Sequence, residues 1–379
     1  MRYVLVIVAL VGCGDRGIST NERARLLAMP PVWTAAARAE RCPRAALRTP
    51  VTGDRSARLA ALSDKSSPEQ QCLARVKELR TELGPCAPQE HCGPQTLATV
   101  KPHPDVVAAC APLYAAIDDV AHASEACTST SVWNDDNVVS VLSLGNAVRL
   151  EVAPLAARGQ LGEAARRVLD AIRFADDFAR KSAVLGEMSS TAAAFRLADT
   201  LDELASDPRL TADDARAIAR DLDVLLATSP RWDVIMRQED AWGATFALTH
   251  DHDPVPELAR FDARERELQR VCRGTLRGCV EHIDAEDIEG AGIFIDYAKR
   301  LGQRDYLLAF VRMQIELRLA RPEDCNNPLR RRALVQPWAD RAIVGDEAEP
   351  VVTPPAWQRI TASQQTHAPR VLHCVPAMI

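Results

Sequence analysis

The longest run of regularly spaced apolar residues lies between residues 134 and 228 and predicts four successive amphipathic helices. Asn134, followed by Asp135 and Asp136, is a good N-cap with acids in the first turn, where the helix dipole favours negative charge. Pro154 lacks a backbone N–H and crowds the preceding turn, so we expect it to kink or end the first helix. This run is the only stretch long and apolar enough to build a core.

The second helix has an apolar stripe that consists of Leu161, Ala164, Ala165, Val168, Ile172, Ala175 and Ala179. The third begins near Ser182 and ends before Pro208. Its stripe consists of Leu185, Met188, Ala192, Phe195, Ala198, Leu201 and Leu204. Thr211 and Asp214 resemble a capping box and predict the start of the fourth helix.

Further helices are predicted on both sides of this run. Ser67-Pro68-Glu69 has the cap, the proline and the acid of a helix start, and Gly84-Pro85 stops that helix. The others are expected at residues 106–120, from 229, and at 256–273, 285–301 and 304–320. Beyond Pro322 the periodicity fades. The sequence therefore predicts an all-α fold of packed antiparallel helical hairpins, as a bundle or short solenoid, with an irregular, Pro-rich C-terminal segment.

We divide the chain into four parts on this pattern. Residues 1–12 form a signal peptide, and residues 13–66 a lipid-anchored tether and N-terminal segment. Residues 67–320 form a disulfide-stapled helical domain, and residues 321–379 the irregular segment.

Arg2 precedes a short apolar run, Tyr3 to Val11, which is the pattern of a signal peptide. The run is too short to span a bilayer. The residues Leu10-Val11-Gly12-Cys13 resemble the lipobox of bacterial lipoproteins. The resemblance implies cleavage before Cys13, acylation of that residue with fatty acids such as palmitate, and anchoring in the inner or outer membrane. The body would then lie in the periplasm or at the cell surface. An ordinary secretory signal with a nearby cysteine is the alternative.

Residues 158–164 resemble the second half of a tetratricopeptide repeat. Gly159, Leu161, Ala164, Val168 and Ala171 match the glycine, apolar and alanine positions of that pattern. Its first half departs from the pattern, because Glu151 and Val152 replace the usual Leu-Gly pair and Asp176 stands where proline is expected. No second copy follows. The resemblance covers about one repeat and implies packed helical hairpins, without an activity.

The net charge of −6 argues against an electrostatic nucleic-acid binder, and loss of Arg2 with the signal peptide makes the mature chain more negative still. No later run is apolar enough to be a second membrane span. We therefore expect no nucleic-acid partner. The expected partners are a membrane, through the lipid anchor, and a protein.

Eleven cysteines leave an even ten once Cys13 is assigned to the lipid, and an exported chain favours disulfides. No Cys-x-x-Cys motif favours a zinc cluster instead. Close spacing suggests the pairs Cys86–Cys92, Cys110–Cys127 and Cys272–Cys279, and elimination leaves Cys42–Cys72 and Cys325–Cys374. The connectivity is a preference, since the spacing does not determine it.

Two groups of residues could bind a metal ion. His250 and His252 alternate with Asp251 and Asp253 before Pro254, where an extended backbone would point the donors the same way. Zinc or copper would need further ligands, and a polar loop that ends a helix is the alternative. The second group consists of Asp118, His122 and Glu125 on one predicted helical face, which could equally be a solvated face. His282 with Asp284, Glu286 and Asp287 more simply serves a helix N-terminus.

We identify no catalytic motif, no catalytic residue and no cofactor. Trp232, Trp242 and Phe246 recur at near-helical spacing and predict core packing, or else a groove for a partner. The leading hypothesis is a lipid-anchored helical protein that binds another protein. The alternative is a metal-binding lipoprotein or metal-dependent hydrolase centred on His250 and His252.

Overall fold

The computed structural model describes residues 47–48, 51–79, 96–126, 141–179, 184–228, 308–321, 323–324 and 327–339. The chain divides into two compact units, and all of these residues belong to the one formed by residues 41–230, 300–345 and 368–379. Among them, no helix combines the length and the apolar character that crossing a membrane requires.

The N-terminal part of this unit contains short elements. They are β1 (Val51–Asp54), α4 (Ser56–Ala60), η1 (Ala61–Ser63), α5 (Pro68–Glu78), η2 (Leu97–Thr99), α7 (Pro104–Ala109), α8 (Ala111–Ala121) and β2 (Ala123–Glu125). The longer helices are α10 (Leu144–Ala157), α11 (Leu161–Ala179), α12 (Val184–Ser206) and α13 (Ala212–Ala227), followed by helical residues 308–319 and by α19 (Pro328–Ala339). The predicted all-α class is confirmed. Its one described sheet is the parallel pair β1–β2, in which Val51 faces Ala123 and Asp54 faces Glu125.

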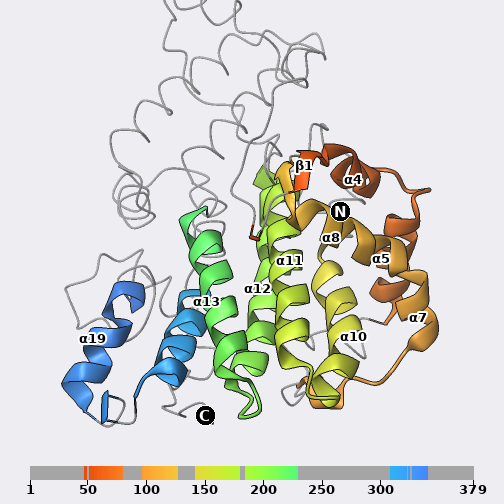
Figure 1. Ribbon diagram of the computed structural model, residues 1–379. Helices are drawn as coiled ribbons and strands as arrows, with labels where there is room; N and C mark the ends of the chain where they lie inside the picture. Colours follow the sequence, from red (N-terminus) through yellow and green to blue (C-terminus); the bar gives the residue numbers. More distant parts are fainter. Residues whose placement is uncertain are drawn as a thin grey trace, which may run out of the picture. The chain divides into compact units, whose positions relative to one another are not determined.

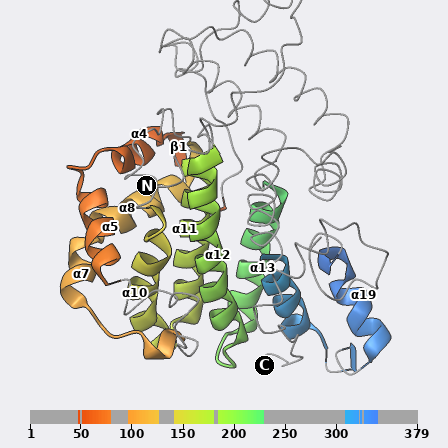
Figure 2. The ribbon, with the colours of Figure 1, turned by 180° about the vertical axis from the view of Figure 1, so that it is seen from behind.

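Helix α11 is the centre of the described unit. It packs against α8, α10, α12 and α13 (Figures 1 and 2). The predicted apolar stripe is buried at every position whose side chain is described, and Phe174 and Phe178 are buried as well. The C-terminal half of α11 is enclosed on all its described positions, including Asp170, Arg173 and Asp177. An amphipathic pattern predicted one polar face for this helix, and that face is buried in its C-terminal half too.

The turn between α10 and α11 follows from local sequence. Gly159 has a φ of 78°, which L side chains rarely adopt. Its N–H donates to the Ala156 carbonyl, and the Gln160 N–H donates to the Leu155 carbonyl, each at 2.9 Å. These two bonds form a Schellman motif, which satisfies the last carbonyls of α10. Pro154 lies within α10 and does not end it, because the helix continues to Ala157.

The boundary between α12 and α13 agrees with the predicted signals. Helix α12 ends at Ser206, before Pro208. The Thr211 hydroxyl accepts the Asp214 N–H at 3.1 Å and donates to an Asp214 carboxylate oxygen at 2.7 Å. Ser67 caps α5 in the same manner by accepting the Gln70 N–H. Local capping chemistry therefore fixes both helix starts.

Polar contacts join the helices across the core. The Tyr114 hydroxyl of α8 donates to the Ala147 carbonyl of α10 at 2.9 Å. Arg149 of α10 is buried and donates to Thr200 and Glu203 of α12 at 3.0 and 3.1 Å. Glu203 also accepts the Leu97 N–H, so that one carboxylate joins η2 to the bundle.

The disulfide that the structure describes joins Cys72 and Cys110, with Cα atoms 4.9 Å apart. The predicted pairs Cys42–Cys72 and Cys110–Cys127 are therefore wrong. Cys72 lies on α5 and Cys110 lies between α7 and α8, and these helices pack against one another. Helix packing brings together two cysteines that are 38 residues apart, which sequence spacing does not reveal. The other eight disulfide candidates lie outside the described residues.

The ends of the unit differ in part from expectation. Leu59 and Leu62 are buried in the core, so packing begins within the segment 13–66. Helix α19 forms in the segment expected to be irregular. It has Pro328 in its first turn, and the Asn327 side chain accepts the N–H groups of Leu329 and Arg330. Its composition gives no clear apolar face, which explains why periodicity missed it.

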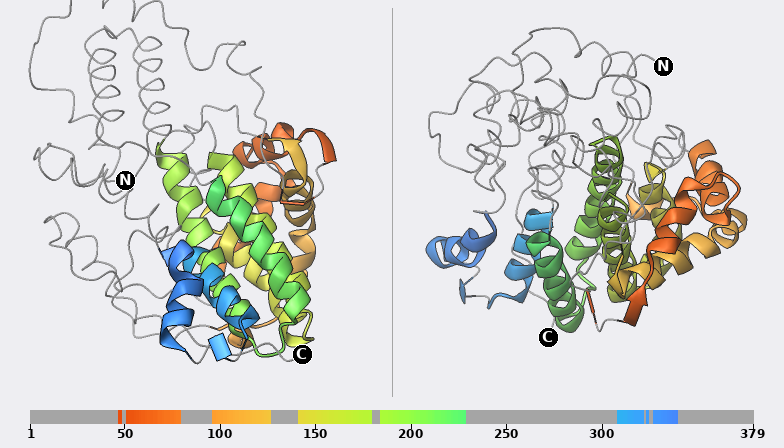
Figure 3. Two further views of the ribbon diagram at one scale, coloured as in Figure 1. Left: turned by 60° about the vertical axis from the view of Figure 1, so that its left-hand side comes forward. Right: turned by 90° about the horizontal axis from the view of Figure 1, so that it is seen from above.

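Helical residues 308–319 lie beside α13, as the view from above shows (Figure 3). Arg312 pairs with Asp223 of α13 at 2.9 Å, and its guanidinium lies 4.2 Å from the ring centroid of Trp338 on α19. The expected helix start at Asn134 and the expected helices at 256–273 and 285–301 lie outside the described residues.

Candidate functional site

The structure describes one of the predicted groups of metal-type donors. His250, His252 and the group around His282 lie outside the described residues, as do Trp232, Trp242 and Phe246. Asp118 and His122 lie on adjacent turns at the end of α8, with Asp118 Oδ1 3.8 Å from His122 Nε2. Glu125 is not on their face, because α8 ends at Ala121 and Glu125 belongs to β2.

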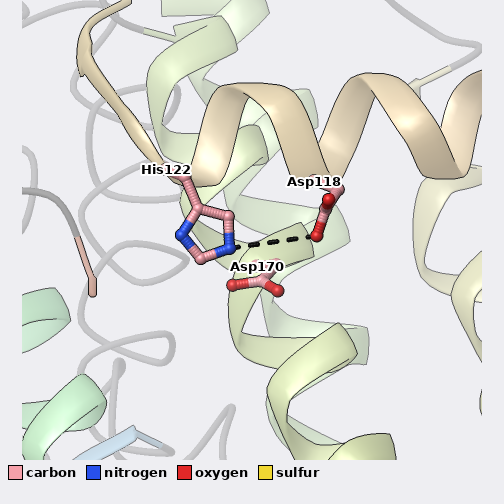
Figure 4. Close-up of side chains that lie close together, drawn as sticks. All are labelled: Asp118, His122 and Asp170. Atoms are coloured by element: carbon pink, nitrogen blue, oxygen red, sulfur yellow. Dashed lines mark ion pairs between the residues drawn. The ribbon is translucent and has the colours of Figure 1, made fainter. Parts of the chain in front are cut away.

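Asp170 of α11 takes the place that we expected for Glu125. One ligand atom from each of Asp118, His122 and Asp170 lies within 4.8 Å of the other two. Figure 4 shows the two α8 side chains directed toward the Asp170 carboxylate. The Asp118 side chain is 55% exposed and the Asp170 side chain only 3%, so the group extends from the surface into the core.

Arg48 reaches this group from the N-terminal segment. Its Nη1 lies 2.9 and 3.0 Å from the two Asp170 oxygens and 3.3 Å from His122 Nε2. Its Nη2 lies 3.2 Å from Asp221 of α13 and donates to the Arg166 carbonyl at 3.4 Å. One guanidinium therefore joins α8, α11 and α13. We call Arg48, Asp118, His122, Asp170 and Asp221 the Arg48 cluster.

Burial dominates the electrostatics of the two carboxylates that Arg48 contacts. It raises the pKa of both Asp170 and Asp221, and the charge of Arg48 opposes that rise. The Asp170 and Asp221 side chains are 3% and 7% exposed. Without Arg48, two nearly buried carboxylates would be left without their cation, which is a strongly destabilising arrangement.

A second arm of ionisable residues extends from the Arg48 cluster along α10 and α11. Arg167 lies 3.5 Å from Asp118 and 3.6 Å from Glu151. Burial raises the pKa of Glu151 to about 7; Arg167 opposes that rise, and the charges of Asp170 and Asp118 add to it. A carboxyl group that titrates near neutral pH is typical of functional sites, and also of buried ion networks.

The position of Arg48 determines what the cluster can bind. Histidine and carboxylate oxygens are suitable ligands for a divalent metal. However, the guanidinium already lies against the Asp170 oxygens and His122 Nε2, the atoms that a metal ion would need, and its positive charge would repel that ion. We therefore interpret the group as an ion network in which Arg48 supplies the cation.

Sequence reasoning missed Arg48, Asp170 and Asp221. Arg48 and Asp170 are 122 residues apart, and no spacing rule connects them. Asp170 itself indicated a buried ion pair, because it lies in the most regular apolar run of the chain, where a buried charge needs a partner. The sequence alone did not identify that partner.

Arg173 and Asp177 are a further buried pair on α11. Their side chains have no exposed area, with Arg173 Nε 3.7 Å from an Asp177 oxygen, and Arg173 also donates to Thr228 at 2.7 Å. The buried charges of α11 therefore extend beyond the Arg48 cluster.

In comparisons with known proteins, no family model, no curated protein and no solved structure matches this chain.

Proposed function

We propose that the protein is exported, anchored to a bacterial membrane through acylated Cys13, and binds another protein through its helical domain. The buried Cys72–Cys110 bridge is the observation that supports this proposal best. Its two cysteines are 1% and 0% exposed and join α5 to the start of α8. Structural disulfides persist in oxidising compartments and are rare in the cytosol of mesophiles. The bridge thus supports the same location as the residues Leu10-Val11-Gly12-Cys13.

The binding role is supported by architecture. Packed helical hairpins present extended surfaces that bind proteins in many repeat families. Helices α10 and α11 form the hairpin whose turn resembles a tetratricopeptide repeat, and the two helices pack against each other.

Lipidation is tested on the membrane-extracted full chain and on a Cys13→Ala variant. We expect the intact mass of the parent to correspond to a chain that begins at Cys13 and carries acyl groups. The variant should lack the acyl mass and keep its signal peptide at that bond. A parent with an unmodified Cys13, or with another first residue, would refute the anchor.

Protein binding is tested by cross-linking in intact cells. The cross-linked protein is identified by mass spectrometry, produced separately and titrated against the purified chain. Saturable binding of that protein supports the proposal, and the absence of any partner that binds after purification contradicts it.

The metal alternative is tested separately by thermal melting with and without zinc. A zinc-dependent stabilisation that His250→Ala with His252→Ala removes would favour the metal-binding function instead.

A further inference from the structure

Residues 47–48 and β1 form a docked segment that is held at two neighbouring places. Leu47 is buried in the core, and Arg48 enters the Arg48 cluster. Strand β1 pairs with β2, and the Arg55 N–H just after β1 donates to the Glu125 carbonyl at 3.0 Å. Both attachments involve the chain around His122, which is the C-cap residue of α8 and immediately precedes β2.

One nitrogen atom of His122 faces groups of opposite charge. Nε2 lies 3.3 Å from Arg48 Nη1 and 3.8 Å from Asp118 Oδ1. A guanidinium can only donate, so its contact with Nε2 requires a lone pair on that nitrogen, and the imidazole is then neutral. A protonated imidazole has N–H groups on both nitrogens. Its charge would repel Arg48 and attract Asp118. Gain of one proton by His122 would therefore change the partner of Nε2 from Arg48 to Asp118.

We propose that Arg48 and His122 form a proton-sensitive fastening, which holds the docked segment on the helical domain at neutral pH and releases it when His122 gains a proton. Histidine is the side chain whose charge ordinarily changes between about pH 5 and 8. Protonation removes one acceptor from Arg48 and places a second cation beside it.

As the pH falls, the other ionisable groups around Arg48 either weaken its attachment or leave it unchanged. Asp170 of α11 and Asp221 of α13 are its two anions, and burial favours their neutral forms as the pH falls. On α8, Asp118 can accept from the protonated imidazole. Glu151 of α10 faces Arg167 of α11, one turn from the cluster, and Arg220 of α13 adds a positive charge near Asp221. None of these groups supplies a new anion to Arg48 in acid.

The proposed pH-sensitive attachment of the docked segment follows from these contacts alone. Its consequence rests on the proposed lipid anchor, because the docked segment lies between Cys13 and the helices. Release would lengthen the tether and uncover the parts of α8, α11 and α13 that Arg48 contacts.

The test is hydrogen exchange of the purified full chain, followed in peptides from residues 47–54 and from α11, with rates corrected for intrinsic pH dependence. Between about pH 8 and 5, we expect the docked segment to lose protection while α11 keeps it. Simultaneous loss in both peptides means global unfolding and would overturn the proposal, as would a docked segment that stays protected at the lower pH.

Three variants separate the roles of the residues. His122→Gln keeps an acceptor and cannot gain a charge, so its docked segment should remain protected to lower pH than in the parent. Arg48→Ala should raise exchange of that segment about a hundredfold at neutral pH, because two buried carboxylates lose their cation. Arg48→Lys keeps the charge without the forked geometry, and should give an intermediate rate if Arg48→Ala fails to fold.

Arg58→Ala is the matched control. It removes the exposed pair between Arg58 of α4 and Asp119 of α8, 2.9 Å apart, and should leave the pH of release unchanged. A His122→Gln variant that releases at the same pH as the parent would exclude His122 as the sensor. If the docked segment of Arg48→Ala is as protected as that of the parent, Arg48 does not hold this segment. Arg48→Lys serves for the same comparison if Arg48→Ala does not fold.

Discussion

Gly145 of α10 lies directly against Arg196 of α12. A Cβ atom at position 145 would stand 2.8 Å from Arg196 Cβ and 2.7 Å from its Cγ. Contacts this short do not occur between real carbon atoms, so any side chain at position 145 would separate the two helices. The glycine permits α10 and α12 to approach, even though glycine within a helix is unfavourable.

We expect Gly145→Ala to destabilise the protein by about 1–3 kcal/mol, the range for overpacking a well-packed core. The gain in helix propensity, about 1 kcal/mol, opposes this loss and does not overcome it. Urea unfolding measures the change. The control is a double-mutant cycle with Arg196→Gly, in which the substitution at position 145 should be less harmful. Additive effects would show that the two residues do not clash.

Stability should also depend on the proton bound to Glu151. Burial raises the pKa of this group from 4.5 in the unfolded chain to about 7 in the folded protein. The folded state therefore holds a proton that the unfolded chain releases. The resulting stabilisation is complete below pH 4.5 and is lost as the pH rises through 7.

Glu151→Gln should remove this dependence. Between acid and about pH 8, we expect the parent to lose up to about 3 kcal/mol more than the variant, since one pKa unit corresponds to about 1.4 kcal/mol. Unfolding free energies at a series of pH values provide the measurement. Glu78→Gln, an exposed change at the end of α5, is the control and should keep the slope of the parent. An unchanged slope in Glu151→Gln would contradict the prediction.

Local signals predicted the helices well, and long-range pairings poorly. Thr211, Ser67 and Gly159 act on backbone groups within a few residues, so their effect is legible in the sequence. Leu201 was predicted to be buried and has no exposed area. Phe195, from the same stripe, is only partly buried. Ala194 and Leu197, which the predicted stripe omitted, have no exposed area. Periodicity therefore predicted that this helix has a buried face better than it predicted which positions form that face.

The candidate site could not be predicted because it depends on which helices meet. Asp118 and His122 are one turn apart and were visible as a pair. Their partners Asp170, Asp221 and Arg48 come from other elements, and only tertiary packing joins them. The same reason explains the incorrect disulfide pairs, since closeness along the chain does not measure the distance between packed helices.

Arg318 holds the connection between α12 and α13. Its side chain is nearly buried and donates to the carbonyls of Pro208 and Leu210 at 2.8 Å and to that of Ala205 at 3.3 Å. We expect Arg318→Ala to destabilise the protein by about 2–4 kcal/mol, because hydrogen bonds from a charged donor are strong and the buried acceptors would lose their partner.

Arg216→Ala is the control for loss of an arginine. It breaks an exposed pair with Asp213, and such pairs contribute about 1 kcal/mol or less. Thermal melting compares the two variants. Equal losses would indicate that the contacts of Arg318 add nothing beyond a surface charge.

The last prediction concerns the disulfide, because sequence spacing and elimination assigned its two cysteines to other partners. Peptide mapping without reduction should recover residues around Cys72 linked to those around Cys110, 38 positions later. A bridge that closes a loop of this length stabilises a protein by about 3–4 kcal/mol in the chain-entropy description. Cys72→Ala and Cys110→Ala should therefore each lower the free energy of unfolding by a similar amount, and the double variant should lose little more than either one. A peptide that links Cys72 to Cys42, or single losses that add in the double variant, would mean that the two cysteines do not form one bridge.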